Sequence, residues 1–193
     1  MRRQAAHRPN DAAFAWESLT DVNDGPEHMR ALIVTLCLIL SSVAVHGAAP
    51  TKTFASLIVV EKAKRSLTLY AGKKPIKTYR IVLGGNPVGD KEQEGDSRTP
   101  EGRYIIDAKN PNSSFHLSLH ISYPDRQDRA AARRKGVPPG GAIMIHGSPD
   151  YLSALYATGV YPDWTAGCIA VSNAEIEEIY ASVRVGTRIG IKP

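Results

Sequence analysis

Short runs of aliphatic and β-branched residues, separated by turns, constrain the fold of this chain from residue 56 onward. The first three are LIVVE, SLTLY and IKTYRIVLG, and Ala71-Gly72-Lys73 forms a turn between the last two. Such runs, bounded by turn residues, are typical of β-strands. We therefore expect a β-meander in which Leu67, Leu69 and Ile76 face the core.

The same pattern returns toward the C-terminus. Further strands are expected at 103–107, in FHLSLHISYP, at 142–146 and in the closing GTRIGIKP. A short polar helix is expected in DRQDRAAARRK, ended by Gly136, a short helix or turn in YLSALYATG, and a stronger helix in SNAEIEEIYASV, capped by Ser172 or Asn173. Because the chain also holds 16 Gly and 13 Pro, it is expected to be a single, mainly β domain with a few short helices.

The N-terminal quarter has the pattern of an export signal. Residues 1–28 are polar, whereas Met29-Arg30 precedes the apolar run ALIVTLCLILSSVAV, which is followed by small residues. This order fits a signal peptide at 29–49. A retained membrane anchor is the alternative, although the apolar run is short for a bilayer span. Residues 1–28 are then an extension upstream of a natural start at Met29, and the exported domain occupies 54–192.

The chain has two cysteines, Cys37 and Cys168. Cys37 lies in the apolar N-terminal run, so cleavage of a signal peptide leaves Cys168 as the only thiol and leaves no internal disulfide. An unpaired thiol in an oxidising compartment is at risk of oxidation. Its presence there indicates a chemical role for Cys168.

Charge and histidine spacing bear on the classes of partner. The net charge of +5 is spread along the chain, which suits an anionic cell-envelope polymer, and no helix-turn-helix or stacking-aromatic motif indicates nucleic acid. His116 and His120 share a strand face and, with His146 and Cys168, raise the possibility of zinc. We expect them instead to line a cleft or bond to the backbone, with no metal and no cofactor.

The stretch from Ile143 to Asn173 holds the residues that point to chemistry. His146-Gly147 ends the apolar run AIMIH, and Gly167-Cys168 follows, with Cys168 22 positions after His146. A thiol becomes a nucleophile when an imidazole accepts its proton, and a neighbouring glycine lets backbone N–H groups approach a reacting carbonyl oxygen. One interpretation makes Cys168 the nucleophile, His146 the base and Gly167 part of an oxyanion hole. The other is a buried structural cysteine and a core histidine.

This stretch resembles the active site of the L,D-transpeptidases with a YkuD-type catalytic domain. That family carries a His-Gly pair and, later, a Ser/Thr-x-Gly-Cys-Ile/Val motif, which here is Thr165-Ala166-Gly167-Cys168-Ile169. The upstream RTPEGRY matches the family's Thr-Pro-x-Gly-aromatic turn. The segments VGDKEQEGDSRTPEGRY, SFHLSLHISYPD and DWTAGCIAVSN bring the likeness closest to the YafK-type branch. It covers about residues 56–192.

The resemblance implies a β-sandwich of mixed sheets and a periplasmic enzyme of peptidoglycan metabolism. Cys168 is expected to attack the carbonyl after the diamino-acid residue of a stem peptide, with His146 as proton acceptor and donor, and to pass the thioester to an amine. A cysteine peptidase or amidase that releases peptide or a wall-linked lipoprotein is the alternative with the same chemistry. A non-catalytic wall-binding module is the alternative from another class.

Two positions depart from the family pattern. Many members carry His before the Gly-Cys pair and Arg shortly after it, whereas this chain has Ala166 and Ala170. Substrate contacts must therefore come from other side chains. The candidates are His120, Tyr123, Arg98, Trp164 and Thr165.

Overall fold

The computed structural model describes residues 53–193. The expected signal peptide at 29–49 and Cys37 lie outside this range. The elements follow in the order β1 (Leu57–Glu61), β2 (Ser66–Ala71), β3 (Lys74–Arg80), β4 (Gly102–Ser113), β5 (His116–Ile121), α2 (Arg126–Lys135), β6 (Met144–His146), α3 (Asp150–Ala157), β7 (Ile169–Ala170), α4 (Asn173–Ser182) and β8 (Arg188–Lys192). Within residues 53–193, no helix is long and apolar enough to cross a bilayer.

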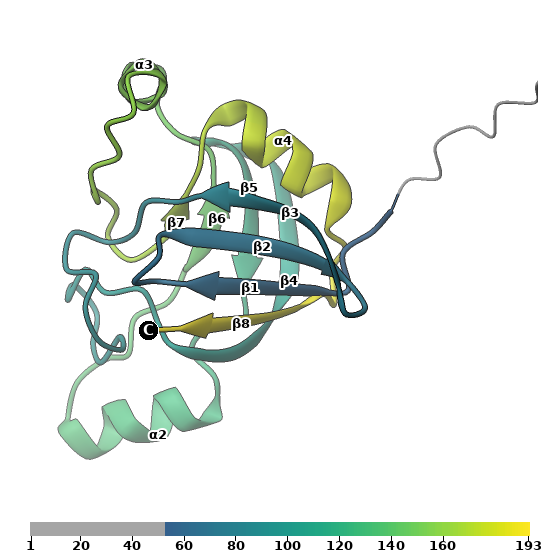
Figure 1. The fold of residues 1–193 in the computed structure, drawn as a ribbon. Helices are drawn as coiled ribbons and strands as arrows, with labels where there is room; N and C mark the ends of the chain where they lie inside the picture. Colours follow the sequence, from purple (N-terminus) through teal and green to yellow (C-terminus); the bar gives the residue numbers. More distant parts are fainter. Residues whose placement is uncertain (1–52) are drawn as a thin grey trace, which may run out of the picture. The chain divides into compact units, whose positions relative to one another are not determined.

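The strands form one curled, mixed sheet in the order β3-β2-β1-β8-β4-β5-β6-β7. The pairs β1–β8 and β6–β7 are parallel and the others are antiparallel. The long strand β4 joins the two halves, because its first part pairs with β8 and its second part with β5. Figure 1 shows the two halves facing each other. The expected mainly β single domain with mixed strand pairing is confirmed.

The two ends of the curled sheet meet beside β7. The chain that leaves β3 forms an antiparallel bridge from Val82 to Ala170 and a parallel bridge from Gly84 to Thr165. The backbone N–H groups of Val82 and Ala170 each donate to the other's carbonyl at 2.9 Å. Cys168 lies between the two bridged positions, so closure of the sheet fixes the backbone on both sides of the thiol.

Alternation along the strands places the core between the two halves of the sheet. Leu67 and Leu69 of β2 are fully buried, as expected, and burying each such side chain stabilises the fold by about 2 kcal/mol. The expectation for Ile76 is wrong, since it is 38% exposed. The β2–β3 register shifts between Leu69 and Tyr70, which pair with Lys77 and Pro75. Ile76 is therefore the extra residue of a bulge in an edge strand.

Local sequence signals set the helices. Helix α4 begins at the capping box formed by Ser172 and Glu175, and α2 ends at Gly136, which adopts a left-handed φ of 70°. Both ends agree with expectation. Figure 1 shows α4 lying beside the sheet, with α2 and α3 at opposite ends of the domain. Strand β4 runs to Ser113 rather than ending near 107, because pairing with β5 extends it through turn-forming residues.

Candidate active site

Parallel pairing of β6 and β7 places His146 on the strand next to the one that Cys168 precedes. His146 ends β6 and pairs with Ala170, while Cys168 immediately precedes β7. Paired residues of adjacent strands point to the same face of a sheet. The side chain of His146 therefore shares a face with Ala170, and Cys168 lies two residues before Ala170, just outside β7.

The His146 ring is held in one tautomer. Its Nδ1 lies 2.6 Å from the carbonyl oxygen of Gly147, and a carbonyl oxygen can only accept a hydrogen bond. Nδ1 therefore carries the proton, and Nε2 keeps the lone pair that a base needs. The orienting group is a backbone carbonyl rather than Ser148, whose Oγ donates to the Val171 carbonyl at 2.8 Å.

Aromatic rings enclose the His146 imidazole. Phe115 stacks on it with ring centroids 4.6 Å apart, and Trp164 meets it edge-on at 5.8 Å. His146 is only 3% exposed. Burial lowers its pKa below the usual 6.5, although the bond to the Gly147 carbonyl partly opposes this. The imidazole is consequently neutral at physiological pH and available as a base.

The thiol of Cys168 rests in its protonated form. Cys168 is half-buried, and its Sγ lies 3.5 Å from the carbonyl oxygen of Ala142. Burial raises the pKa of the thiol above 9.0, against the lowering effects of the Met144 backbone N–H and the Lys91 charge. Within the described chain, no hydrogen bond joins Sγ to the His146 ring. The resting pair is thus a neutral thiol and a neutral imidazole.

The side-chain hydroxyl of Thr165 stabilises the Gly167-Cys168 turn through two hydrogen bonds. Thr165 Oγ1 accepts the Gly167 N–H at 3.1 Å and donates to the Cys168 carbonyl at 2.7 Å. Thr165 is only 6% exposed, so its hydroxyl shapes the turn and does not present itself to a substrate. The Gly167 N–H, expected to be an oxyanion donor, is already bonded in this conformation.

Only a glycine fits at position 167 in this backbone conformation. Its φ is +127°, and a Cβ there would lie 2.6 Å from the Arg98 carbonyl oxygen. A second glycine shares this packing, since a Cβ on Gly84 would lie 2.0 Å from the Ser97 carbonyl oxygen. The segment that carries Arg98 is therefore pressed against the turn that carries the thiol.

The remaining expected contacts divide into surface and core positions. The Nδ1 of His120, on the partly exposed face of β5, lies 2.6 Å from Asp107 Oδ1, and His120 pairs with Met144 of β6. The half-buried Arg98 directs Nη1 to the Asp90 carbonyl oxygen at 3.3 Å. His116 contacts Glu177 instead of the thiol. Among residues 53–193, no cluster of three or more metal-ligating side chains occurs.

The structure corrects the expectation for Tyr123. Its side chain is 3% exposed, its hydroxyl donates to the Pro139 carbonyl at 2.9 Å, and its ring meets Tyr104 edge-on. These are core contacts, which fasten the segment before β6 and leave no surface for a stem peptide.

A hydrogen bond to a tyrosine of α3 fixes the position of the Trp164 ring. Its Nε1 donates to the Tyr156 hydroxyl at 3.0 Å, and the Tyr156 ring stacks on Tyr161 at 4.7 Å. Phe115 and Tyr156 are not among the expected site residues. Alternation in the run FHLSLHISYP predicts only that Phe115 faces inward. Phe115 in fact precedes β5, and its stacking on His146 depends on the β5–β6 register. No local signal in the sequence reveals that register.

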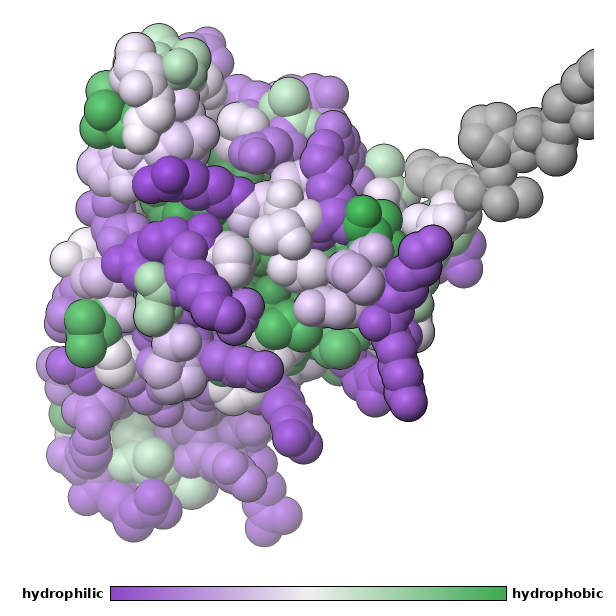
Figure 2. All heavy atoms as spheres, in the orientation of Figure 1, coloured by the Kyte–Doolittle hydropathy of each residue, from purple (hydrophilic) through white to green (hydrophobic). Residues whose placement is uncertain are grey.

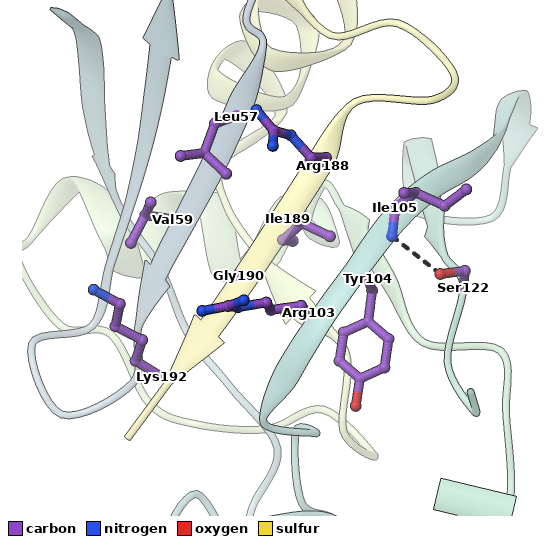
Figure 3. A pocket seen from close by; sticks show the side chains of 10 residues that line it. All are labelled: Leu57, Val59, Arg103, Tyr104, Ile105, Ser122, Arg188, Ile189, Gly190 and Lys192. Atoms are coloured by element: carbon purple, nitrogen blue, oxygen red, sulfur yellow. Dashed lines mark hydrogen bonds between the residues drawn. The ribbon is translucent and has the colours of Figure 1, made fainter. Parts of the chain in front are cut away.

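A cavity of about 550 Å³ lies elsewhere, on the outer face of β1, β8 and β4. Figure 3 shows the side chains of Arg103, Arg188 and Lys192 around Gly190 in this cavity. On the same side of the molecule, apolar residues emerge between long hydrophilic side chains (Figure 2). Neither His146 nor Cys168 lines this cavity, so it is separate from the candidate active site.

The fold and site together define a class: β-rich domains in which a Gly-Cys turn lies beside the His-Gly end of a neighbouring strand. The family model of the YkuD L,D-transpeptidase catalytic domain matches residues 55–191. The chain belongs to this family.

Relatives of known sequence or structure agree with the family assignment. The chain is 29% identical over 132 residues to YafK of Escherichia coli K12, which carries an L,D-transpeptidase name. The match covers 65% of this chain and 46% of that protein. The helical cell shape determining protein Pgp2 of Campylobacter jejuni superposes with a TM-score of 0.56 at 27% identity, over 72% of this chain and 48% of that one. Bd1075 of Bdellovibrio bacteriovorus shares the fold, with a TM-score of 0.52 at 24% identity over 72% and 48% of the two chains. This chain thus spans about half the length of these relatives.

Proposed function

We propose that this chain is an exported peptidoglycan L,D-transpeptidase that works through a thioester on Cys168. The observation that carries the proposal is the β6–β7 pairing, since it pairs His146, whose neutral imidazole has a fixed tautomer, with Ala170, two residues after Cys168. Membership of the YkuD family supplies the substrate class, the stem peptides of peptidoglycan.

The acylation step begins when the thiol turns from the Ala142 carbonyl toward His146. Nε2 takes the thiol proton as Sγ forms a bond to the carbonyl carbon that joins the diamino acid to the following D-residue. The tetrahedral intermediate collapses, the C–N bond breaks, and His146 returns the proton to the departing amine. The product is a thioester between Cys168 and the diamino-acid residue.

The second step resolves the thioester. An acceptor amine attacks the thioester carbon, its proton passes to His146, and the C–S bond breaks to regenerate the thiol. Water in place of the amine gives hydrolysis, the outcome expected of an amidase that releases peptide or wall-linked lipoprotein. The Cys168 N–H is the proposed first donor to the oxyanion. Use of the Gly167 N–H requires exchange of its bond to Thr165 Oγ1.

Three expected contacts are retained as parts of the substrate site. Trp164 forms a wall beside the imidazole, and His120 is presented on the open face of β5, near Met144. Arg98 is half-buried and directs Nη1 to the Asp90 carbonyl oxygen, and its guanidinium is the proposed donor to a substrate carboxylate. Ala170 is fully buried against Val82 and Tyr156, so an arginine has no room there.

Acylation tests the proposal directly. The full chain is incubated with a carbapenem, whose strained carbonyl acylates nucleophiles, and is followed by intact-protein mass spectrometry. One adduct is expected on the native sequence and on Cys37→Ala, and none on Cys168→Ala. An adduct that persists on Cys168→Ala refutes Cys168 as the nucleophile. Retained sacculus binding without any adduct favours the wall-binding module.

A further inference from the structure

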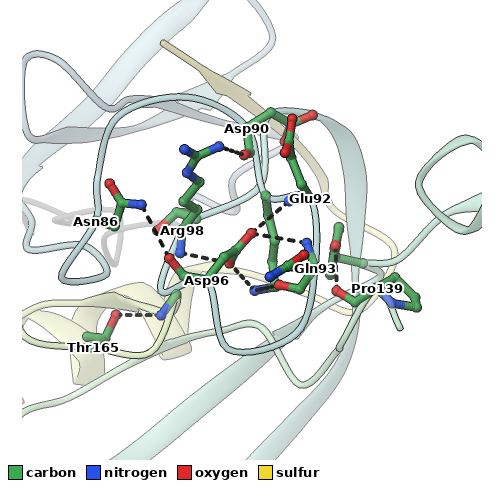
Figure 4. A network of polar contacts seen from close by, with 12 residues as sticks. Asn86, Asp90, Glu92, Gln93, Asp96, Arg98, Pro139 and Thr165 are labelled. Carbon is green, nitrogen blue, oxygen red and sulfur yellow. Dashed lines mark hydrogen bonds and ion pairs between the residues drawn. The ribbon is translucent and has the colours of Figure 1, made fainter. Parts of the chain in front are cut away.

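A buried ion pair organises the loop that presses on the thiol turn. Lys91 Nζ lies 2.6 Å from Asp96 Oδ1 and 3.0 Å from the Gln93 carbonyl oxygen. The side chains of Lys91 and Asp96 are only 3% and 11% exposed. Asp96 also accepts the backbone N–H groups of Glu92, Gln93 and Arg98 at 2.8 to 3.1 Å. Figure 4 shows Asp96 at the centre of these bonds.

This loop meets both backbone segments that flank the Cys168 sulfur. On one side, the Arg98 carbonyl packs on Gly167. On the other, Lys91 Cε would lie 3.5 Å from a Cβ on Gly140, two residues before Ala142, whose carbonyl contacts Sγ. The ammonium of Lys91 is thus buried in a loop that packs against both segments flanking the Cys168 sulfur, where water screens its charge weakly.

The charged residues of this loop include Lys91, Asp96, Arg98 and Glu94, whose Cα would lie 3.2 Å from a Cβ on Gly140. Burial alone would raise the pKa of Asp96, but the bonds from Lys91 and three backbone N–H groups lower it to about 2, so the pair is ionised at working pH. The Lys91 charge lowers the pKa of the thiol and opposes the effect of burial. The Arg98 guanidinium donates to the backbone carbonyl of Asp90, Asp163 is bound to Arg65, and His146 is neutral.

We propose that Lys91 is an electrostatic positioning residue of the active site, held by Asp96 so that its ammonium stabilises negative charge as it develops on Cys168. The inference rests on the proposed function, in which Cys168 is the nucleophile. Without this cation, stabilisation of the negative charge that arises as the thiol loses its proton is left to the protonated His146 and to backbone N–H groups. The proposal explains why an ammonium is buried here despite its desolvation cost.

Lys62 provides a matched control. It is also buried, at 2% exposure, and its Nζ donates to the Thr99 carbonyl and to Glu101 at 2.9 and 2.8 Å. It therefore fastens the same loop, but its charge is directed to Glu101 rather than to the thiol. Loss of either lysine loosens the loop. Only loss of Lys91 removes the positive charge that lowers the pKa of Cys168.

The test is the rate at which iodoacetamide alkylates Cys168 between pH 6 and 10, followed on the peptide that carries Cys168. Lys91→Met is expected to move the profile to higher pH, and alkylation at pH 7 slows about tenfold for each pH unit that the profile moves. Lys91→Arg keeps the native profile, and so does Lys62→Met. An unchanged profile in Lys91→Met, or an equal displacement in Lys62→Met, overturns the proposal.

A second variant covers the case in which Lys91→Met does not fold. Lys91→Gln keeps a side-chain N–H that can donate to Asp96 and removes only the positive charge, so its alkylation profile should also move to higher pH. A native profile in Lys91→Gln contradicts the electrostatic role. Alkylation requires no turnover. Failure of this inference is therefore distinguishable from failure of the transpeptidase proposal, which Cys168→Ala tests.

Discussion

Gly167 and Arg98 are in direct backbone contact: a Cβ on Gly167 would lie 2.6 Å from the Arg98 carbonyl oxygen. This contact joins the turn that carries the thiol to the loop that Asp96 organises. A side chain cannot be inserted at 167 without moving one of the two segments. The placement of Cys168 therefore depends on a residue that has no side chain.

Gly167→Ala is expected to slow acylation of Cys168 by a carbapenem about a hundredfold, because the turn must shift to relieve the contact. Thermal unfolding should show a free energy of unfolding lower by about 1–3 kcal/mol, because alanine would have to adopt the positive φ of residue 167. Gly85→Ala is the control, since nothing lies within 4 Å of a Cβ there, and it should acylate at the native rate. Native acylation in Gly167→Ala would contradict the role given to this contact.

Thr165→Val removes the hydroxyl that bonds both the Gly167 N–H and the Cys168 carbonyl. Because the hydroxyl is buried, its loss leaves two backbone groups without this partner. Urea unfolding should therefore show a free energy of unfolding lower by about 1–3 kcal/mol, and acylation of Cys168 should be slower. Thr165→Ser retains the hydroxyl and should keep most of the native stability and most of the native acylation rate. If Val and Ser behave alike, the hydroxyl does not hold the turn.

The pH profile of acylation follows from the two pKa directions. Because burial lowers the pKa of His146, the base is lost only as pH falls through a value below 6.5. Because burial raises the pKa of Cys168, alkylation by iodoacetamide should still be rising as the pH passes 9.0. Stopped-flow measurements from pH 5 to 10 give both the loss of acylation at low pH and the rise of alkylation at high pH. An alkylation plateau at neutral pH would indicate a resting thiolate and contradict the neutral pair.

Trp164→Ala opens one wall of the imidazole enclosure and admits water to the ring of His146. Since burial is what lowers this pKa, the pKa should rise toward its usual value of 6.5, and the acid limb should move with it. Trp164→Phe keeps an apolar wall and should stay near the native value. NMR titration of the His146 ring gives the pKa in each variant, and equal values in Ala and native protein would exclude the enclosure as the cause.

Strands and helix ends are predictable from this sequence because their signals are local. Leu67 and Leu69 alternate with polar neighbours, and Ser172 and Gly136 carry the chemistry of a helix start and a helix end. Ile76 is mispredicted, since a bulge in β3 arises from pairing with β2 and not from the residues beside it. The extension of β4 to Ser113 has the same origin.

The site is predictable only in part for a related physical reason. The His-Gly and Gly-Cys motifs predict His146 and Cys168 as the catalytic pair, and family membership supports that prediction. The contacts of their neighbours depend on which strands become adjacent. Tyr123 is predicted at the substrate and lies in the core, while Phe115 stacks on the imidazole through a register that no motif encodes. Lys91 is a charged residue in an acidic loop, and only the folded loop shows its ammonium to be buried.

Muropeptide analysis tests the central claim most directly. The chain is incubated with purified sacculi or with disaccharide tetrapeptide, and the products are digested and separated by liquid chromatography with mass detection. With the native chain we expect new dimers joined between two diamino-acid residues, together with release of the terminal D-residue. Both products should be absent with Cys168→Ala and with His146→Ala. Release of peptide without dimers would contradict transpeptidation in favour of hydrolysis. Dimers formed by Cys168→Ala would contradict the thioester mechanism itself.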